Sequence, residues 1–285
     1  MTTLRYLYFP GCQLNTRLPQ YDLSVRTIMA QFDVTLYDRE MNCCGYPVRH
    51  QDLTASVLAA ARNLAVAARE GLALMTPCQC CYGNLKHADY WLRQKPELRR
   101  DVNAILKNEG LRWNAGVRVH HLLSVLADEI GRSSIHDRIT QPLSGIRIAA
   151  HYGCHALRPG HVVQFDNPLA PSLFEKLVEA TGAKAVDWPL RLECCGHPQW
   201  GKNDRLALAL MVRKIKDAQL AGAQLLTTAC TYCQIQFDAV RADQRRENGA
   251  GADLPAVLYT QLLGRAMGLP DERLGVAANR IQPCW

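Results

Sequence analysis

The chain has 285 residues, 48% of them hydrophobic and 21% charged, a globular composition with enough apolar material for one large or two modest domains. No apolar run approaches the roughly 20 residues of a membrane span, and the amino-terminal residues lack the regions of a secretory signal, so we expect a cytoplasmic protein without a membrane span. The formal net charge of +7 is spread out, without a stripe of interleaved basic and aromatic residues, which argues against nucleic-acid binding.

The first half of the chain alternates short β-type runs with helical patterns. Cys12 follows the first predicted strand, the doublet Cys43–Cys44 follows the second, and Cys78 follows the third. Gly71 is placed to end the long helix between the second and third strands. In chain order we expect a strand at 4–9, a helix at 23–32, a strand at 34–37, a helix at 52–71 and a strand at 72–76.

The second half repeats this order. Cys154 and Cys230 again follow predicted strands, and Asn203 is a plausible N-cap for the long helix. The predicted elements are a strand at 147–152, a helix at 171–182, a strand at 183–188, a helix at 203–222 and a strand at 224–229. Strands that alternate with helices indicate parallel α/β units.

Self-similarity between the halves indicates an internal duplication. The string NCCGYP at 42–47 aligns with ECCGHP at 193–198, and GLALMTPCQCC at 71–81 aligns with GAQLLTTACTYC at 222–233. Cys43 and Cys194 lie 151 positions apart, and Cys78 and Cys230 lie 152 apart. The interval before the second doublet is longer, which places an insertion around 156–170. We therefore predict two homologous α/β domains, residues 1–143 and 144–285, divided near a turn-rich stretch at 141–145.

Each half offers one cysteine, a doublet and a C-x-x-C pair. Because the carboxyl ends of parallel strands meet at one edge of a sheet, we expect the five thiols of a half to converge. The first set is Cys12, Cys43, Cys44, Cys78 and Cys81, and the second is Cys154, Cys194, Cys195, Cys230 and Cys233. Cys80 and Cys284 have no counterparts in the repeat, and the simplest interpretation of each is a small apolar side chain.

Three interpretations of these sets compete. A disulfide between adjacent cysteines would close a strained ring and is rare. Structural zinc takes four ligands in a closed tetrahedron, which leaves one thiol of each set idle. Thiolate-only sites in a reducing compartment favour iron–sulfur ligation, although a cubane cluster also takes four cysteines. The surplus thiolate, which the doublet supplies, therefore predicts an unusual cluster without fixing its geometry.

The two patterns, C-x30-CC-x33-C-x2-C and C-x39-CC-x34-C-x2-C with glycine after each doublet, resemble the tandem CCG-domain family and, within it, the B subunit of heterodisulfide reductase. The resemblance covers nearly the whole chain and includes side strings such as YFPGC at 8–12 and HYGCH at 151–155. It implies that each five-cysteine set binds a noncubane [4Fe-4S] cluster, with zinc an alternative at the first site. A disulfide or thiol substrate would then be handled between the two clusters.

The resemblance also implies partners, because the chain lacks ferredoxin, dinucleotide-binding and haem motifs of its own. They would be the ferredoxin-like and the flavin-containing subunits of the same complex. The alanine- and arginine-rich composition favours the bacterial sulfur-oxidising version, with a substrate carried on a protein, over the methanogen version that reduces the mixed disulfide of coenzymes M and B. Two other functions stay open: an electron-relay subunit of a lactate, glycolate or quinone-linked oxidoreductase, and a zinc-stabilised scaffold.

Five thiolates make a strongly anionic centre that nearby cations would offset. Five candidates lie within six residues of a predicted ligand, namely Arg17, Arg49, Arg158, His155 and His197, although each is also compatible with an ordinary surface charge. His155 adjoins Cys154, and histidine titrates near neutral pH, so His155 is the expected catalytic proton donor.

Overall fold

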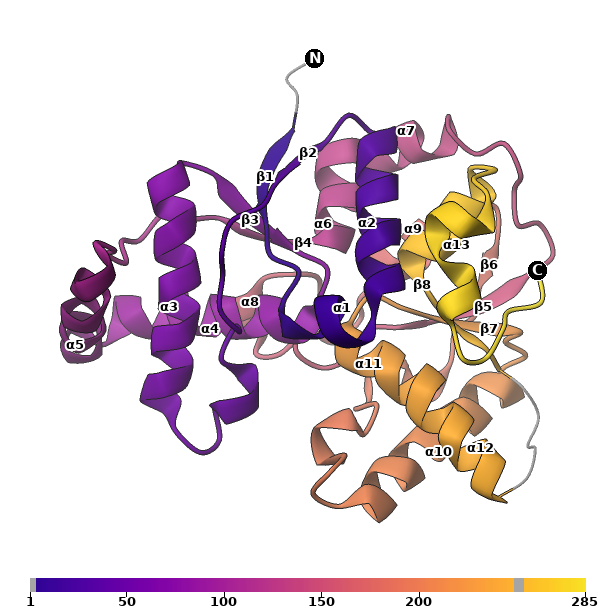
Figure 1. Cartoon of the computed structure of the whole chain (residues 1–285). Helices are drawn as coiled ribbons and strands as arrows, with labels where there is room; N and C mark the ends of the chain where they lie inside the picture. Colours follow the sequence, from indigo (N-terminus) through magenta and orange to yellow (C-terminus); the bar gives the residue numbers. More distant parts are fainter. Residues whose placement is uncertain (1–3, 249–253) are drawn as a thin grey trace.

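The computed structural model describes residues 4–248 and 254–285, and it contains two four-stranded sheets in which every strand pair is parallel (Figure 1). The first sheet has the order β2-β1-β3-β4 and the second has the order β6-β5-β7-β8, so the two topologies are identical. The strands are β1 (Arg5–Tyr8), β2 (Thr35–Tyr37), β3 (Ala73–Thr76), β4 (Val119–His121), β5 (Arg147–His151), β6 (Lys184–Ala185), β7 (Leu225–Thr228) and β8 (Ala256–Leu258). The predicted duplicated α/β fold is confirmed.

Helices connect the strands in both halves. The first half has α1 (Cys12–Arg17), α2 (Pro19–Gln31), α3 (Leu53–Glu70), α4 (Gln79–Gln94), α5 (Pro96–Leu106), α6 (Leu122–Ser124) and α7 (Arg132–His136). The second half has α8 (Gly160–Val163), α9 (Leu173–Glu179), α10 (Asp204–Leu220), α11 (Thr231–Ile235), α12 (Arg241–Asn248), α13 (Tyr259–Ala266) and α14 (Asp271–Leu274). Among the described residues, no helix combines the length and the apolar character that crossing a bilayer requires.

The ends of the two long helices follow the local sequence signals. Asp52 accepts a hydrogen bond from the Ala55 amide at 2.9 Å, and Asn203 accepts one from the Leu206 amide at 3.0 Å. These side chains satisfy amides that have no partner inside the first turn of α3 and α10. Gly71 ends α3 in the left-handed conformation, with a φ of 65°. The predicted caps at Asn203 and Gly71 are thus confirmed.

Several features differ from the sequence-based expectations: α4 was not predicted, and the helix expected at 171–182 occurs only as Leu173–Glu179. The strand expected at 183–188 is only two residues long, and a 3-10 helix begins at Pro189, after Trp188, whose buried indole donates to the carbonyl of Ala150 at 3.2 Å. The sequence patterns also gave no indication of β4 and β8. Each has three residues, too few for an alternating pattern to stand out.

The halves pack against each other reciprocally, as related copies do about a two-fold axis. Helix α2 of the first half contacts α13, and α9, which holds the same place in the second half, contacts α6. In the same way α1 contacts α11, and α8 contacts α4. The two helices that begin at the C-x-x-C pairs, α4 and α11, contact each other and so lie at the pseudo-two-fold axis. Figure 1 shows α2 beside α13, although these helices are far apart in sequence.

Candidate metal centre

The carboxyl ends of the strands bring each cysteine set together. In the first half Cys12 begins α1 after β1, the doublet lies in the loop after β2, and Cys78 precedes α4 after β3. The Sγ atoms of Cys12 and Cys43 are 3.8 Å apart although 31 residues separate them. Convergence at the strand ends occurs as the sequence predicts.

The five thiols of each half form a chain of neighbouring, hydrogen-bonding side chains. In the first half the chain runs Cys12, Cys43, Cys44, Cys81, Cys78, and in the second it runs Cys154, Cys194, Cys195, Cys233, Cys230. The order of structural roles is the same in both halves: strand-end cysteine, doublet, second C-x-x-C residue, first C-x-x-C residue. Each chain begins at a more accessible thiol, Cys12 or Cys154, and ends at a buried one.

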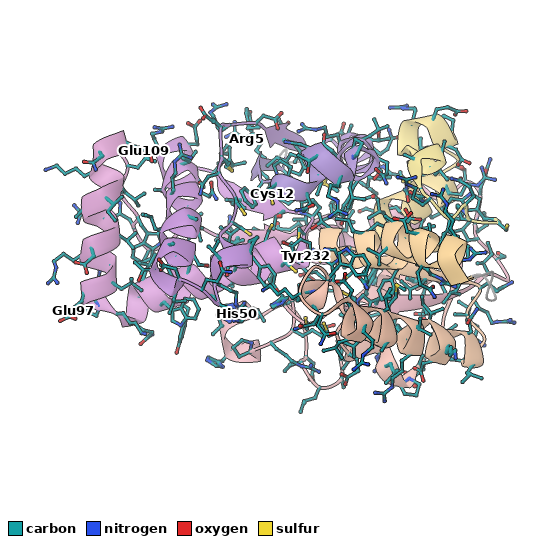
Figure 2. The ribbon with its side chains drawn as sticks, turned by 60° about the horizontal axis from the view of Figure 1, so that its bottom comes forward. Arg5, Cys12, His50, Glu97, Glu109 and Tyr232 are labelled. Atoms are coloured by element: carbon teal, nitrogen blue, oxygen red, sulfur yellow. The ribbon has the colours of Figure 1, made fainter. Side chains whose placement is uncertain are left out.

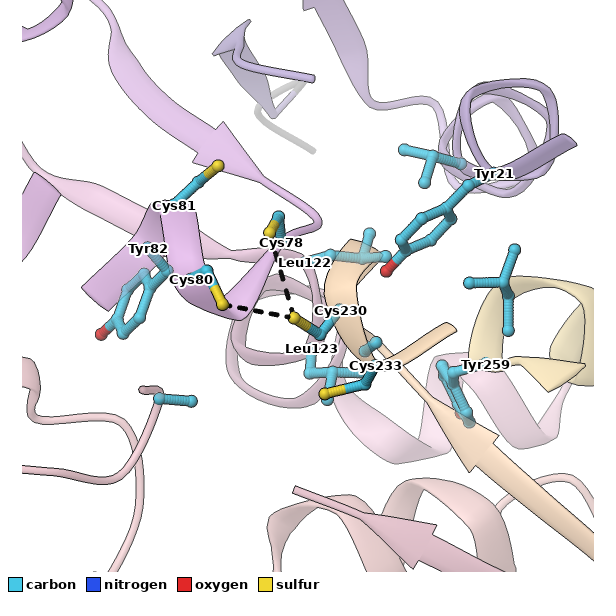
Figure 3. Close-up of a cluster of buried hydrophobic side chains, with 14 of the residues drawn as sticks. Tyr21, Cys78, Cys80, Cys81, Tyr82, Leu122, Leu123, Cys230, Cys233 and Tyr259 are labelled. Atoms are coloured by element: carbon cyan, nitrogen blue, oxygen red, sulfur yellow. Dashed lines mark hydrogen bonds between the residues drawn. The ribbon is translucent and has the colours of Figure 1, made fainter. Parts of the chain in front are cut away.

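The two chains meet at their buried ends. The Sγ atoms of Cys78 and Cys230 are 4.0 Å apart, across the interface between the halves (Figure 3). Cys80, which the repeat left unassigned, lies at the same place, with its Sγ 3.8 Å from that of Cys230. Its position in the repeat is occupied by Tyr232 in the second half, and both residues line the cavities of both sites. Cys284 is exposed.

Each doublet is held by the long helix that follows it. Gly45 and Gly196, directly after the doublets, have φ values of 87° and 95°, and both approach the backbone of that helix closely. In the first half Asn63 of α3 donates to the Asn42 carbonyl at 3.1 Å, and the buried Asn84 amide of α4 adds a hydrogen bond to the Cys44 carbonyl at 2.6 Å. Backbone carbonyls near the doublet are thereby satisfied inside the protein.

Aromatic side chains from both halves form the wall beside the thiols. The Tyr46 hydroxyl lies 2.7 Å from His155 Nε2, which joins the first half to the second. The ring of Tyr232 lies 5.6 Å from that of Tyr46 and 4.6 Å from that of His197, measured between centroids. Figure 2 shows Cys12 and Tyr232 in the middle of the molecule, between the two halves.

The predicted cationic residues divide into two groups. Arg49 lies over the Tyr46 ring at 5.5 Å, whereas Arg17 and Arg158 are exposed. Burial and the charge of Arg49 lower the pKa of His155 to about 4. The imidazole is therefore neutral near pH 7 in this structure, and its observed contact is the hydrogen bond with Tyr46, so its expected role as proton donor stays a prediction.

The thiols strongly perturb one another's ionisation. Hydrogen bonds from neighbouring thiols lower the pKa of Cys43 to about 3 and that of Cys194 to about 2. The partners of these hydrogen bonds, Cys12 and Cys154, have pKa values raised by the same contacts and by burial. In the first set the pKa of Cys78 is lowered as well, because its burial is outweighed by hydrogen bonds from Cys230 and other neighbours. The remaining thiols of that set have raised pKa values, so ionising all five thiols needs a compensating cation.

The donor set fits iron–sulfur clusters. Among the described residues, the cavity of the first site is lined by all five of its predicted cysteines, and the cavity of the second by four of its five. The fifth, Cys194, hydrogen-bonds Cys154 and Cys195. Neither lining contains a carboxylate in the described part of the chain. Convergent thiolates without hard oxygen ligands are the donors that iron–sulfur clusters take.

Two residues that the sequence analysis did not assign to a site, His151 and Cys80, lie beside the predicted ligands. His151 Nε2 lies 3.3 Å from Cys233 Sγ, and the three ligand atoms of His151, Cys195 and Cys233 lie within 4.8 Å of one another. Cys78, Cys80 and Cys230 form a second such group. His151 is part of the string HYGCH, but no pattern in that string distinguishes a ligand neighbour from a core histidine.

Comparison with known proteins identifies a family with similar sequence. The cysteine-rich domain family named CCG matches residues 6–86 and 148–238. A solved structure from Helicobacter pylori, described as a hypothetical protein, is similar with a TM-score of 0.78 at 16% identity. That likeness covers 98% of this chain and 52% of the solved chain, which shows that the fold recurs in a longer protein.

Three relatives are similar over almost their whole length. The B subunit of the ferredoxin/F(420)H(2)-dependent CoB-CoM heterodisulfide reductase of Methanosarcina acetivorans is 31% identical over 96% of this chain and 93% of its own. A protein of Archaeoglobus profundus, described as like the B subunit of heterodisulfide reductase, is 30% identical over 95% and 93%. The 8-methylmenaquinol:fumarate reductase membrane anchor subunit of Wolinella succinogenes is 30% identical over 97% and 96%. With two matching domains and such relatives, the chain belongs to the cysteine-rich CCG-domain family as a tandem member related to the B subunit of heterodisulfide reductase.

Proposed function

We propose that this protein is the catalytic iron–sulfur subunit of a heterodisulfide-reductase-like complex. It transfers electrons to or from a disulfide, thiol or sulfane-sulfur substrate that binds between two noncubane [4Fe-4S] clusters, one in each five-cysteine set. The observation that carries the proposal is the contact between the buried ends of the two sets, with 4.0 Å between the Sγ atoms of Cys78 and Cys230. Two redox sites that lie directly beside each other suit a reaction that moves two electrons and separates two sulfur atoms.

The electron balance of the reaction matches a paired site. Reduction of a disulfide takes two electrons and two protons, breaks one S–S bond and yields two thiols. When bound, the iron–sulfur clusters supply one-electron transfer and a Lewis-acidic iron. The protein's own part is to hold the ligand thiolates, to exclude water with the wall of Tyr46, Tyr232 and His197, and to keep the hydrogen bond between Tyr46 and His155 beside the site.

The proposed setting is a reducing cytoplasm, in which thiols stay reduced and available to bind iron, and none of the twelve cysteines forms a disulfide in the structure. A ferredoxin-like subunit and a flavin-containing subunit of the same complex supply or remove the electrons. The composition favours bacterial sulfur oxidation, with sulfane sulfur carried on a protein, over reduction of the CoM–CoB mixed disulfide. The names of the Methanosarcina relatives, B subunits of CoB-CoM heterodisulfide reductases, support disulfide chemistry in general and do not favour the sulfur-oxidising setting over the other.

A second candidate is an electron-relay subunit without sulfur chemistry. The fumarate reductase subunit of Wolinella succinogenes, at 30% identity, favours it, because that protein's name places it in a quinol-linked complex. The two functions differ in whether a thiol reaches the clusters directly.

The test uses anaerobically purified full-length protein. We expect about eight irons and a similar amount of acid-labile sulfide per chain, the content of two four-iron clusters. Adding a small thiol such as mercaptoethanol to the oxidised protein should change the paramagnetic resonance signal. The variants Cys44→Ser and Cys195→Ser, each lacking one doublet thiolate, should lose the response at their own site.

Cys284→Ser provides the matched control, because Cys284 is exposed and lies outside both sets. It should retain the wild-type iron content and thiol response. About two zincs per chain without sulfide would contradict the redox function and favour the zinc-stabilised scaffold. Full iron content with a paramagnetic resonance signal that does not change when the thiol is added would favour the electron-relay subunit.

A further inference from the structure

The two halves have matching folds, but the side chains around their thiol sets differ in charge. The strand registers establish which residues correspond: Tyr8 pairs with Met75 in the first sheet, and Ala150 pairs with Thr227 in the second. The next residues, Phe9 and His151, therefore occupy equivalent positions beside the two sets. A phenyl ring in the first half is replaced by an imidazole in the second.

His151 is placed to donate a hydrogen bond to a ligand sulfur. It is fully buried, and its Nε2 lies 3.3 Å from Cys233 Sγ. Nδ1 has no hydrogen-bond partner among the described residues, which assigns the proton to Nε2, the nitrogen that faces the sulfur. Phe9 offers no such donor to the first set.

A second difference lies in the long helices. Lys214 follows the N-cap Asn203 by eleven residues, and Asn63 follows the N-cap Asp52 by the same interval, so the two are counterparts. Asn63 is neutral and binds the backbone before its doublet. Lys214, only 1% exposed, donates to the Leu190 carbonyl and lies 4.6 Å over the Trp188 ring.

The ammonium of Lys214 acts on the second thiol set. Burial lowers its pKa to about 8, against an opposing attraction from Cys195, Cys233, Glu193 and Cys194, so it stays protonated near neutral pH. Glu193, the carboxylate of that group, is exposed and therefore screened by water. For the thiols of the first set, the main electrostatic influences are other cysteines, backbone amides and the Thr231 hydroxyl, and none of these is a cation. The Thr231 hydroxyl, 3.0 Å from Cys78 Sγ, and the Gln13 amide, which donates to Cys12 Sγ at 3.9 Å, are neutral groups that partly offset the hydrogen bond of His151 but not the charge of Lys214.

The hydrogen bond from His151 and the charge of Lys214 both stabilise the extra negative charge that reduction adds at the second site. Hydrogen bonds to ligand sulfurs and nearby net charge are among the main determinants of iron–sulfur reduction potentials. Helix dipoles do not separate the sites, because helical segments of similar length, 79–94 and 231–248, follow the two C-x-x-C pairs. The greater exposure of Cys12 acts in the opposite direction, but water screens charge there, whereas Lys214 and His151 act inside the protein.

We infer that the site in the second half has the higher reduction potential and takes the first electron, with His151 and Lys214 as the residues that set this order. The inference rests on the proposed function, because it concerns clusters bound by the two sets. Each reduction moves one electron from an external one-electron carrier, which is oxidised by one electron, and no bond of the protein forms or breaks. The difference in reduction potential would determine which site is reduced first, and so the order in which the two electrons become available to the substrate.

The experiment is a mediated redox titration of the full-length protein followed by paramagnetic resonance, after iron and sulfide analysis has established that both clusters are present. Wild-type protein should show two one-electron transitions at separate potentials. His151→Phe, which installs the first half's own residue, should move only the upper transition to lower potential. We expect about a tenfold change in its reduced-to-oxidised ratio at fixed potential, which is ~59 mV for a one-electron couple.

Lys214 provides an independent pair of variants. Lys214→Met, which removes the charge, should lower the same transition, and Lys214→Arg, which keeps it, should leave it near the wild-type value. A purely structural role would not distinguish these two. Coincident transitions, a shift of the lower transition, or unchanged potentials in both His151→Phe and Lys214→Met would overturn the inference while leaving the proposed function intact. Absence of iron would instead overturn the proposed function and the inference with it.

Discussion

Gly45 and Gly196 shape the sites as directly as the cysteines that precede them. Both have positive φ, a region that side chains with Cβ occupy at a cost. A Cβ at Gly45 would overlap the Ser56 carbonyl oxygen, and one at Gly196 would overlap the Ala207 carbonyl oxygen. The glycine lets the doublet loop lie directly against the first turn of the long helix, which fixes the direction of the two thiols.

Gly196→Ala should be more destabilising than Gly201→Ala. Both positions have positive φ, so each substitution should lower the free energy of unfolding by about 1–2 kcal/mol. Only Gly196 also meets a neighbouring backbone atom, whereas a Cβ at Gly201 would have open space, so overlap should add about 1–3 kcal/mol at Gly196. Denaturant unfolding of the two variants measures the difference. Equal losses would mean that the close approach to α10 does not matter.

At the scale of elements, α3 and α10 connect each doublet to the rest of its domain. Each is capped by a side chain, Asp52 or Asn203, that follows the doublet loop directly. The cap fixes where the helix begins, and the helix backbone in turn supports the glycine after the doublet. The cap, the helix and the thiol site therefore form one structural unit in each half.

Asn203→Ala should lower the free energy of unfolding by about 1 kcal/mol, because the Leu206 amide loses its hydrogen-bond acceptor. Asn203→Asp, which installs the cap of the first half, should retain most of the stability. Thermal unfolding of both variants beside wild-type protein provides the measurement. A similar loss in the aspartate variant would show that the side-chain oxygen is not what stabilises this helix end.

The sequence predicts the two longest helices well because their signals are local, although it gave no indication of α4, which has sixteen residues. The helices expected at 52–71 and 203–222 occur at Leu53–Glu70 and Asp204–Leu220, and strand ends place the cysteines as expected. The contacts between the halves could not be predicted, because they depend on tertiary packing. The place of Cys80 beside Cys230 and the hydrogen bond between Tyr46 and His155 are of this kind.

At the scale of the whole molecule, each half completes the other. Helix α2 of the first half is covered by α13 and α14, with the hydroxyls of Ser24 and Thr260 at 2.6 Å and Thr27 donating to the Arg273 carbonyl at 2.9 Å. Tyr82 of the first half donates to the Val163 carbonyl at 2.5 Å. Because several helices and several hydrogen bonds join the two halves, we expect the halves to behave as one cooperative unit.

Leu274→Ala should therefore destabilise both halves. Leu274 is fully buried in α14, and removing its side chain should lower the free energy of unfolding by about 2–5 kcal/mol. Native-state hydrogen exchange should show that the amides of β1 and β3 lose protection together with those of β5 and β7. Loss of protection confined to the second sheet would contradict a single cooperative unit, and Asn203→Asp serves as the conservative control.

The packing of α13 and α14 on α2 also affects when the first site can form during translation. Residues 12–81 contain every thiol of the first set, yet the helix that follows shortly after Cys12 keeps one face in water until residues near 260 and 273 have left the ribosome. A shorter nascent chain also lacks Thr231 and Tyr232, which line the cavity of the first site. Maturation of the first centre should accordingly follow completion of translation and not precede it.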